Sequence, residues 1–195
     1  QHHFGVGIVE TSNNFGAGGL DPTNPDLLDY LASEFVAGDW KIKRMHKLIM
    51  LSSTYRLSSQ TTKSGLEHDP ANRLVWRFNP RRLSSEEVRD SILAANGSLN
   101  LRMGGPSFYP IIPPEVLHGQ SRPGAGWGNS SEEDRARRSV YIFVKRSLVE
   151  PLMADFDFAD VDSSCPVRFT TTQPTQSLQL MNSEFSNRQA AKFAQ

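Results

Sequence analysis

The stretch Leu83-Ser84-Ser85-Glu86-Glu87-Val88-Arg89-Asp90-Ser91-Ile92-Leu93-Ala94-Ala95-Asn96-Gly97 carries the strongest fold signal in the chain. Ser84 and Glu87 have the spacing of a capping box, in which the serine hydroxyl accepts a hydrogen bond at the helix start and the glutamate reaches back. Leu83 and Val88 are placed for a hydrophobic staple, and Gly97 can end the helix in a left-handed conformation. The stretch therefore predicts a helix that begins just after Ser84.

Two more helices are predicted upstream. Asn24 can cap the first, Pro25 suits its first position, and Gly38 stops it. Asp39 can then cap the second. Apolar residues share one face in each helix: Leu27, Leu28, Leu31 and Phe35 in the first, and Ile42, Met45, Leu48 and Ile49, with Ser52, in the second. Because the link is short, we expect the two helices to pack as a hairpin.

The remaining segments predict a mixture of loops and short elements. Loops are expected over residues 1–24, 58–68 and 104–128, with a short turn of helix at Asp69-Pro70 and an extended segment over 74–78. Over residues 140–144, Val140, Ile142 and Val144 alternate with Tyr141 and Phe143, which predicts a strand. The charged run before this segment leaves a helix as the alternative. Three further helices are expected. The first runs from Pro151 through Phe156, the second follows Thr172 as its cap, and the third begins at about Ser183. The fold class is mainly α: a helical domain with long Gly/Pro-rich loops and at most a small two-stranded element.

Composition limits the partners and the setting. The 21 Lys and Arg balance the 21 Asp and Glu, so no net charge draws the chain to nucleic acid. No apolar run is long enough for a membrane span. Residues 1–195 suit a single domain, and because the chain lacks an initiator methionine we expect it to be a fragment of a longer protein, with its N-terminal and C-terminal elements truncated.

Standard catalytic and metal motifs do not stand out. The sequence has no P-loop, no nucleophile elbow and no metalloprotease histidine pair, and the glycines at 16, 18 and 19 lack the strand-turn-helix context of a dinucleotide site. His2, His3 and Glu10 have ligand atoms, but their spacing specifies no metal, so we expect no metal site. Cys165 is the only cysteine, which leaves no pair for covalent haem attachment.

One set of residues has the chemistry of a ligand site. Arg81 and Arg82 precede a helix on which Glu86, Arg89 and Asp90 share a face, and arginine forks pair with carboxylate or sulfate groups. These residues predict a site for an anionic or sugar ligand, or alternatively an internal salt-bridge network. Trp127, in the Gly-rich loop, is a candidate to stack on a sugar ring, whereas Trp40 and Trp76 are expected in the core.

Several ordered segments, spread over nearly the whole chain, resemble one family. They are His2-His3-Phe4-Gly5-Val6-Gly7-Ile8-Val9-Glu10-Thr11, Asn14-Phe15-Gly16, Pro25-Asp26-Leu27-Leu28-Asp29-Tyr30-Leu31-Ala32, Met45-His46-Lys47-Leu48-Ile49, Ser53-Thr54-Tyr55-Arg56, Asp69-Pro70-Ala71-Asn72-Arg73-Leu74, Arg81-Arg82-Leu83, Met103-Gly104-Gly105-Pro106, Arg138-Ser139-Val140-Tyr141 and Thr172-Gln173-Pro174-Thr175-Gln176-Ser177-Leu178-Gln179-Leu180-Met181-Asn182. In this order they are similar to the planctomycete-type domain of unknown function 1553. Relatives usually carry Thr-Asn-Thr-Pro where this chain has Thr171-Thr172-Gln173-Pro174.

The resemblance implies an architecture more than an activity. Such domains form the C-terminal part of large exported proteins with an upstream companion domain and often a cytochrome c-like domain. It therefore implies an exported protein, upstream domains as partners, and haem c in the parent but no cofactor in this fragment. Two functions follow as hypotheses: a non-catalytic structural or binding module, with complex polysaccharide as the ligand, or one half of an enzyme site completed by an upstream domain and linked to the cytochrome c-like domain.

Overall fold

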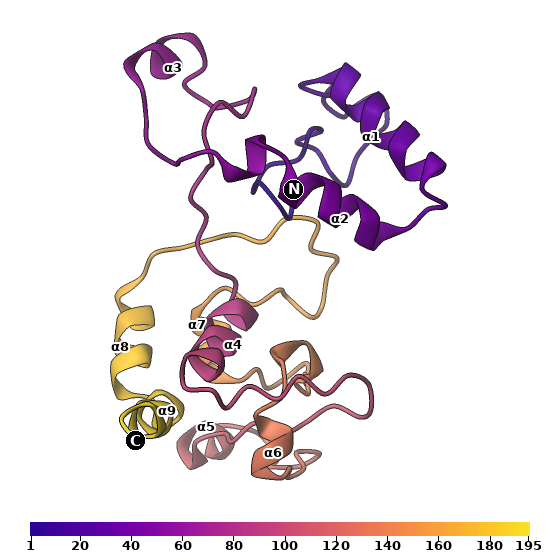
Figure 1. Cartoon of the computed structure of the whole chain (residues 1–195). Coiled ribbons are helices and arrows are strands. Elements are labelled where there is room, and N and C mark those ends of the chain that lie inside the picture. The colour runs from indigo at the N-terminus through magenta and orange to yellow at the C-terminus, as the bar shows by residue number, and fades with distance from the viewer. The chain divides into compact units, whose positions relative to one another are not determined.

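The computed structural model describes all residues from Gln1 to Gln195, and it is mainly helical, as expected (Figure 1). Its α-helices are α1 (Pro25–Ala37), α2 (Ile42–Leu51), α3 (Lys63–His68), α4 (Ser85–Ala95), α5 (Pro114–His118), α6 (Glu132–Arg135), α7 (Pro151–Asp155), α8 (Pro174–Asn182) and α9 (Glu184–Phe193). Two 3-10 turns, η1 (Thr54–Arg56) and η2 (Ser139–Tyr141), complete the set. None of the helices combines the length and apolar character that crossing a membrane requires.

The chain divides into two compact units, Gln1–Arg81 and Arg82–Gln195. The single domain over residues 1–195 stays a prediction. Every fully buried apolar side chain belongs to the second unit: Leu93, Phe108, Ile112, Ile142, Leu148, Leu152, Met153 and Phe156. The hydrophobic core of the chain therefore lies in the C-terminal unit.

The helical hairpin of the N-terminal unit is confirmed, although the start of its second helix differs. Asn24 accepts a hydrogen bond from the Leu27 N–H at 3.0 Å, and α1 packs against α2. Asp39 does not cap α2, because Asp39 and Trp40 both take positive φ angles, 55° and 58°, to turn the chain between the helices. Helix α2 instead begins at Ile42, two residues after Trp40. Lys41 stands at its N-cap, and no side chain caps the helix.

The tryptophans of this unit differ from expectation. Trp40 is 65% exposed, so its assignment to the core is wrong: the left-handed turn projects it beside Phe35 at the surface. Trp76 is half-buried, and its indole N–H donates to the Asp69 carbonyl at 2.8 Å. Its ring lies on Gly65 of α3, a helix in a segment that we expected to be a loop. Thr62 caps α3 by accepting from the Gly65 N–H, which explains a helix in so polar a stretch.

The capping box of α4 forms as predicted. The Ser84 hydroxyl accepts from the Glu87 N–H at 3.3 Å, and the Glu87 carboxylate accepts from the Ser84 N–H at 2.8 Å. Gly97 follows the helix with φ +73°, in the left-handed region. Helix α4 packs against α7, α9 and η2, and α8 contacts both α7 and α9 (Figure 1). Helix α4 is thus the central helix of the C-terminal unit.

The strand predicted over residues 140–144 is wrong. The segment forms η2 and then a single parallel bridge between Ile142 and Phe108. Two hydrogen bonds make this bridge, from the Phe108 N–H to the Tyr141 carbonyl at 2.9 Å and from the Phe143 N–H to the Phe108 carbonyl at 2.7 Å. Prolines stand two residues before and two residues after Phe108. Because proline has no N–H to donate, the ladder cannot extend into a strand pair.

The later helices begin close to their predicted positions. Helix α7 starts at Pro151 and α9 follows its Ser183 cap, as expected. The cap of α8 is Gln173 instead of Thr172, because Gln173 and Gln176 form a capping box there. The 104–128 segment is not wholly a loop, since it contains α5.

Candidate functional site

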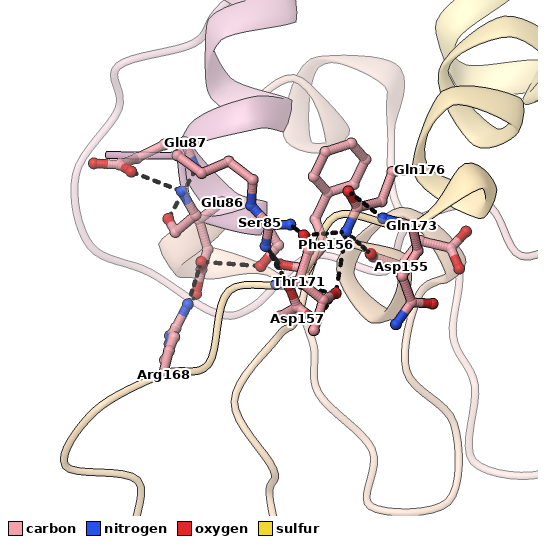
Figure 2. A network of polar contacts seen from close by, with 12 residues as sticks. Ser85, Glu86, Glu87, Asp155, Phe156, Asp157, Arg168, Thr171, Gln173 and Gln176 are labelled. Carbon is pink, nitrogen blue, oxygen red and sulfur yellow. Dashed lines mark hydrogen bonds and ion pairs between the residues drawn. The ribbon is translucent and has the colours of Figure 1, made fainter. Parts of the chain in front are cut away.

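The residues predicted as a ligand site do not converge on one point. Arg81 ends the N-terminal unit and is exposed, whereas Arg82 begins the C-terminal unit and is half-buried. Glu86 accepts hydrogen bonds from the Ser85 hydroxyl and from Arg168 (Figure 2). Arg89 and Asp90 hold a different part of the chain, residues 135–139. The shared helix face is real, but its side chains serve separate contacts.

Arg82 and Asp157 join the start of α4 to the segment before α8. Arg82 donates to the Asp157 carboxylate and to the Thr171 carbonyl. Asp157 also accepts from the Thr171 N–H at 2.8 Å and from its hydroxyl at 2.9 Å. Burial opposes ionisation of Asp157, but the Thr171 N–H and Arg82 together hold the pKa of this carboxyl below its ordinary value. Gln176 completes the network by donating to the carbonyls of Asp155 and Thr171, each at 3.0 Å (Figure 2).

Glu86 and Arg168 form a two-pronged ion pair at the other side of this network. The two guanidinium nitrogens of Arg168 lie 2.6 and 2.8 Å from the Glu86 oxygens, as Figure 2 shows. Burial works against ionisation of Glu86, yet Arg168 holds the pKa of Glu86 below its ordinary value, while Glu86 raises the pKa of Arg168. The pair attaches the 158–171 loop to α4. Such a contact belongs to the internal salt-bridge network that the sequence offered as the alternative to a ligand site.

Arg89 is a buried anchor. Its guanidinium donates to the Arg137 carbonyl at 3.1 Å, to the Ser139 hydroxyl at 3.2 Å and to the Arg135 carbonyl. Its side chain is 4% exposed, and burial lowers its pKa. The neighbouring Asp90 accepts from the Ser139 N–H at 2.8 Å and from its hydroxyl at 2.7 Å. Together Arg89 and Asp90 fix residues 135–139 against α4.

A cavity of about 570 Å³ opens beside Arg89, entirely within the C-terminal unit. One part of its wall is apolar, with Pro110, Ile111, Pro113, Pro114 and Val116. Another part is polar and comes from the end of α8 and from α9, with the side chains of Gln179, Asn182, Glu184, Arg188, Gln189 and Lys192. Phe185 also lines the cavity, and its ring lies 5.2 Å from the Arg89 guanidinium. Apolar walls with a few polar groups are typical of small-molecule sites.

Two carboxylates of this cavity have pKa values shifted in opposite directions. Lys192 contacts Glu132 at 2.6 Å, and its hydrogen bond holds the pKa of Glu132 below the ordinary value. Burial raises the pKa of Glu150, which caps α7 by accepting from the Met153 N–H at 2.9 Å. The cavity therefore presents one acid that readily ionises and one that retains its proton to higher pH.

Trp127 lies close to the cavity without lining it. Its half-buried ring packs edge-on against Tyr109 and Phe143, with ring centres 5.9 and 5.6 Å away. Its indole N–H donates at 3.2 Å to the carbonyl of Pro110, a cavity residue. Trp127 thus supports the cavity wall from behind, and a glycan contact of its own stays a prediction.

His3, near the N-terminus, contacts a partner that is distant along the chain. The His3 Nε2 atom lies 2.8 Å from the Nδ1 atom of His46 on α2, whereas Glu10 pairs with Arg73 at 3.4 Å. Burial and then the neighbouring His46 lower the pKa of His3. No group of three or more His, Cys, Asp or Glu side chains is placed to hold a metal ion. His3 and His46 are 43 residues apart, so spacing along the chain does not reveal the pair.

Apart from Arg89, the cavity residues escaped the sequence interpretation. Glu150 and Pro151 signal a helix start, but Phe185, Gln179 and Asn182 meet Glu150 only through the packing of α7, α8 and α9. Nothing in their spacing marks them as one site.

Comparison with known proteins places the chain in a family. No curated protein and no solved structure matches it. The model of the family described as PSD1, protein of unknown function (DUF1553), matches residues 1–195. Since that match spans the whole chain, the protein belongs to the DUF1553 family.

Proposed function

We propose that the C-terminal unit is a binding module whose cavity takes an uncharged, hydroxyl-rich ligand, a segment of a complex polysaccharide. The observation that carries the proposal is the composition of the cavity wall. Side-chain amides, carboxylates and basic groups line it together with Phe185 and several prolines. Sugar hydroxyls both donate and accept hydrogen bonds, so a wall with both kinds of partner suits them.

The charges of the wall favour a neutral ligand. Four acids, Glu115, Glu132, Glu150 and Glu184, face four bases, Arg89, Arg135, Arg188 and Lys192. Several of these charges pair within the wall: Glu132 lies 2.6 Å from Lys192, and Glu184 lies 3.5 Å from Arg188. A sulfated ligand would have to displace such pairs without a net positive field to attract it. A neutral saccharide can bind while the pairs stay in place.

Phe185 supplies an apolar surface in a fixed position. The buried Arg89 lies against its ring, and Arg89 is itself held by three hydrogen bonds. A ring held in this way loses little rotational freedom when a sugar face packs on it. The expected site is therefore preorganised.

Calorimetric titration of the 195-residue chain with neutral and sulfated oligosaccharides tests the proposal. We expect saturable binding of a neutral oligosaccharide that Phe185→Ala and Asn182→Ala abolish or weaken strongly. Phe169→Ala and Asn187→Ala are matched controls, because both residues are exposed and lie outside the cavity wall. Binding that is equally weakened by the controls, or that is tighter for sulfated sugars, would contradict the proposal.

A second function has a specific observation in its favour: the opposite pKa shifts of Glu132 and Glu150. A carboxyl with a lowered pKa and one with a raised pKa in the same cavity are the kind of pair that general acid–base catalysis uses. We therefore keep the hypothesis of one half of an enzyme site, completed by an upstream domain of the same polypeptide. Assaying the parent protein for new reducing ends on polysaccharide tests it. Glu150→Gln should abolish turnover, whereas Glu133→Gln, which changes an exposed acid outside the cavity, should not.

The wider setting of the module is also a proposal. Family resemblance is what supports export of the parent protein and a cytochrome c-like domain upstream. In that arrangement the binding module would hold the parent at its polysaccharide while the other domains act. Fractionation of cells with an antibody against the C-terminal unit, together with haem staining of the captured protein, tests both parts.

A further inference from the structure

His3 and His46 bring two imidazole nitrogens together from separate parts of the N-terminal unit. His3 belongs to the first turn of the chain, which the Gly5 N–H closes by donating to the Gln1 carbonyl at 2.7 Å. His46 projects from α2 and is exposed. The His3 Nε2 and His46 Nδ1 atoms lie 2.8 Å apart, and the two rings are inclined by 57°. The facing atoms are those through which imidazole binds metals.

The backbone beside His3 is held by aromatic packing. Phe4 contacts both Tyr55 and Phe78, with ring centres 5.7 and 6.1 Å away. Tyr55 also stands edge-on to the His3 ring at 5.8 Å. His46 is fixed in turn by its position within a regular helix. The two imidazoles are thus presented to each other from ordered segments, which reduces the entropy lost when both bind one ion.

We propose that His3 and His46 form a binding site for a late divalent transition metal ion, copper or nickel. Imidazole is a preferred ligand of both ions, and both favour square-planar or tetragonal geometry. Two neighbouring nitrogens in that geometry are bound at right angles and, at about 2.0–2.1 Å from the metal, stand about 2.9 Å apart. The observed separation of 2.8 Å is close to that value. Binding then requires each ring to turn so that its lone pair points at the shared ion.

Water completes the coordination in this proposal, because only two protein ligands meet at the site. Glu10, the nearest acid along the chain, is engaged with Arg73. A site with open positions binds its ion more weakly than a closed four-ligand site, and it leaves room for a further ligand. Of the two ions, copper(II) is expected to bind more tightly.

Copper(II) alone, titrated into the 195-residue chain, tests the site. The Gln1 amino group is first acetylated, so that it cannot join His3 as a copper ligand. We expect one equivalent of copper to bind, with electron paramagnetic resonance showing coupling to two imidazole nitrogens. His3→Asn and His46→Asn should each weaken the affinity by about tenfold or more, because one of two protein ligands is lost.

His2→Asn and His68→Asn are the matched controls. Both histidines belong to the same unit and are exposed; His2 is the chain neighbour of His3, and the His68 ring bonds to the Ser64 carbonyl at 2.8 Å. Unchanged affinity in both controls supports the assignment. Should His3→Asn disturb the fold, the nitrogen count in the unaltered protein still decides. Coupling to a single nitrogen, no saturable binding, or full affinity in His46→Asn would show that the contact is only an imidazole hydrogen bond.

Discussion

Replacing Arg89 by methionine removes the anchor of residues 135–139 while keeping the apolar stem of the side chain. The guanidinium donates to the Arg135 and Arg137 carbonyls and to the Ser139 hydroxyl. An acceptor left buried without a partner costs about 1–3 kcal/mol, and these three do not add fully because they share one donor group. Breaking a buried charged network by removing one partner typically costs about 3–5 kcal/mol. We therefore expect Arg89→Met to lower the unfolding free energy by about 3–5 kcal/mol.

Urea denaturation followed by far-UV circular dichroism measures this loss. Arg138→Ala is a matched control. Both arginines lie near the Asp90 carboxylate, Arg89 at 3.9 Å and Arg138 at 4.0 Å, but Arg138 is exposed. An exposed pair contributes about 0–1 kcal/mol, so the control should stay near the parent stability. Hydrogen exchange should also show that Arg89→Met loosens the Ser139 amide, which donates to Asp90. A loss for Arg89→Met no larger than that for Arg138→Ala would refute the reasoning.

Four further outcomes are expected. Ser84→Ala should cost about 1 kcal/mol, measured by the same denaturation, because it removes the hydroxyl of the capping box. Gly97→Ala should cost about 1–2 kcal/mol, since its φ of +73° is strained for a residue with a Cβ although no atom obstructs that Cβ. The pKa of Glu86 is lower in the folded protein, so its ionised carboxylate stabilises the fold at pH values above its unfolded pKa. This stabilisation is lost as the pH falls through the folded pKa of Glu86. Glu86→Gln should therefore reduce the loss of unfolding free energy that acid causes, measured by denaturation at a series of pH values. Finally, the chain should show no Soret band after incubation with haem and removal of the excess, because Cys165 is the only cysteine and His46 is exposed on α2. A stoichiometric band that is lost in His46→Ala would contradict this.

Local signals predicted the starts of α1, α4 and α9, because capping is a short-range interaction. Ser84 with Glu87, Asn24 with Pro25, and Ser183 each act within one helical turn, and all three helix starts are confirmed. The strand over residues 140–144 failed for the opposite reason. A strand needs a partner, and its partner segment around Phe108 carries prolines that end the pairing.

The candidate site was predictable only in part. The α4 residues were correctly marked as a cluster of charge, but the sequence holds no sign that Arg89 faces inward to Ser139 while Glu86 faces Arg168. Those partners lie about 50 to 82 residues away along the chain. The cavity beside Arg89 depends on the same distant packing. Side-chain chemistry is readable locally, whereas the meeting of groups from α4, α8 and α9 is a property of the tertiary structure.

The long separations across α4 have a consequence for the order of folding during synthesis. Arg82 needs Thr171, which is made 89 residues later, and Arg89 needs Arg137, which is made 48 residues later. Closing such long loops costs entropy before any contact repays it. At the ribosome, α4 therefore emerges with its charged face open. The segment up to Ser139 can dock first, the contacts of Arg82 with Asp157 and Thr171 form next, and α9 docks last. A stalled chain that ends before Thr171 should thus remain sensitive to protease within the 158–168 loop.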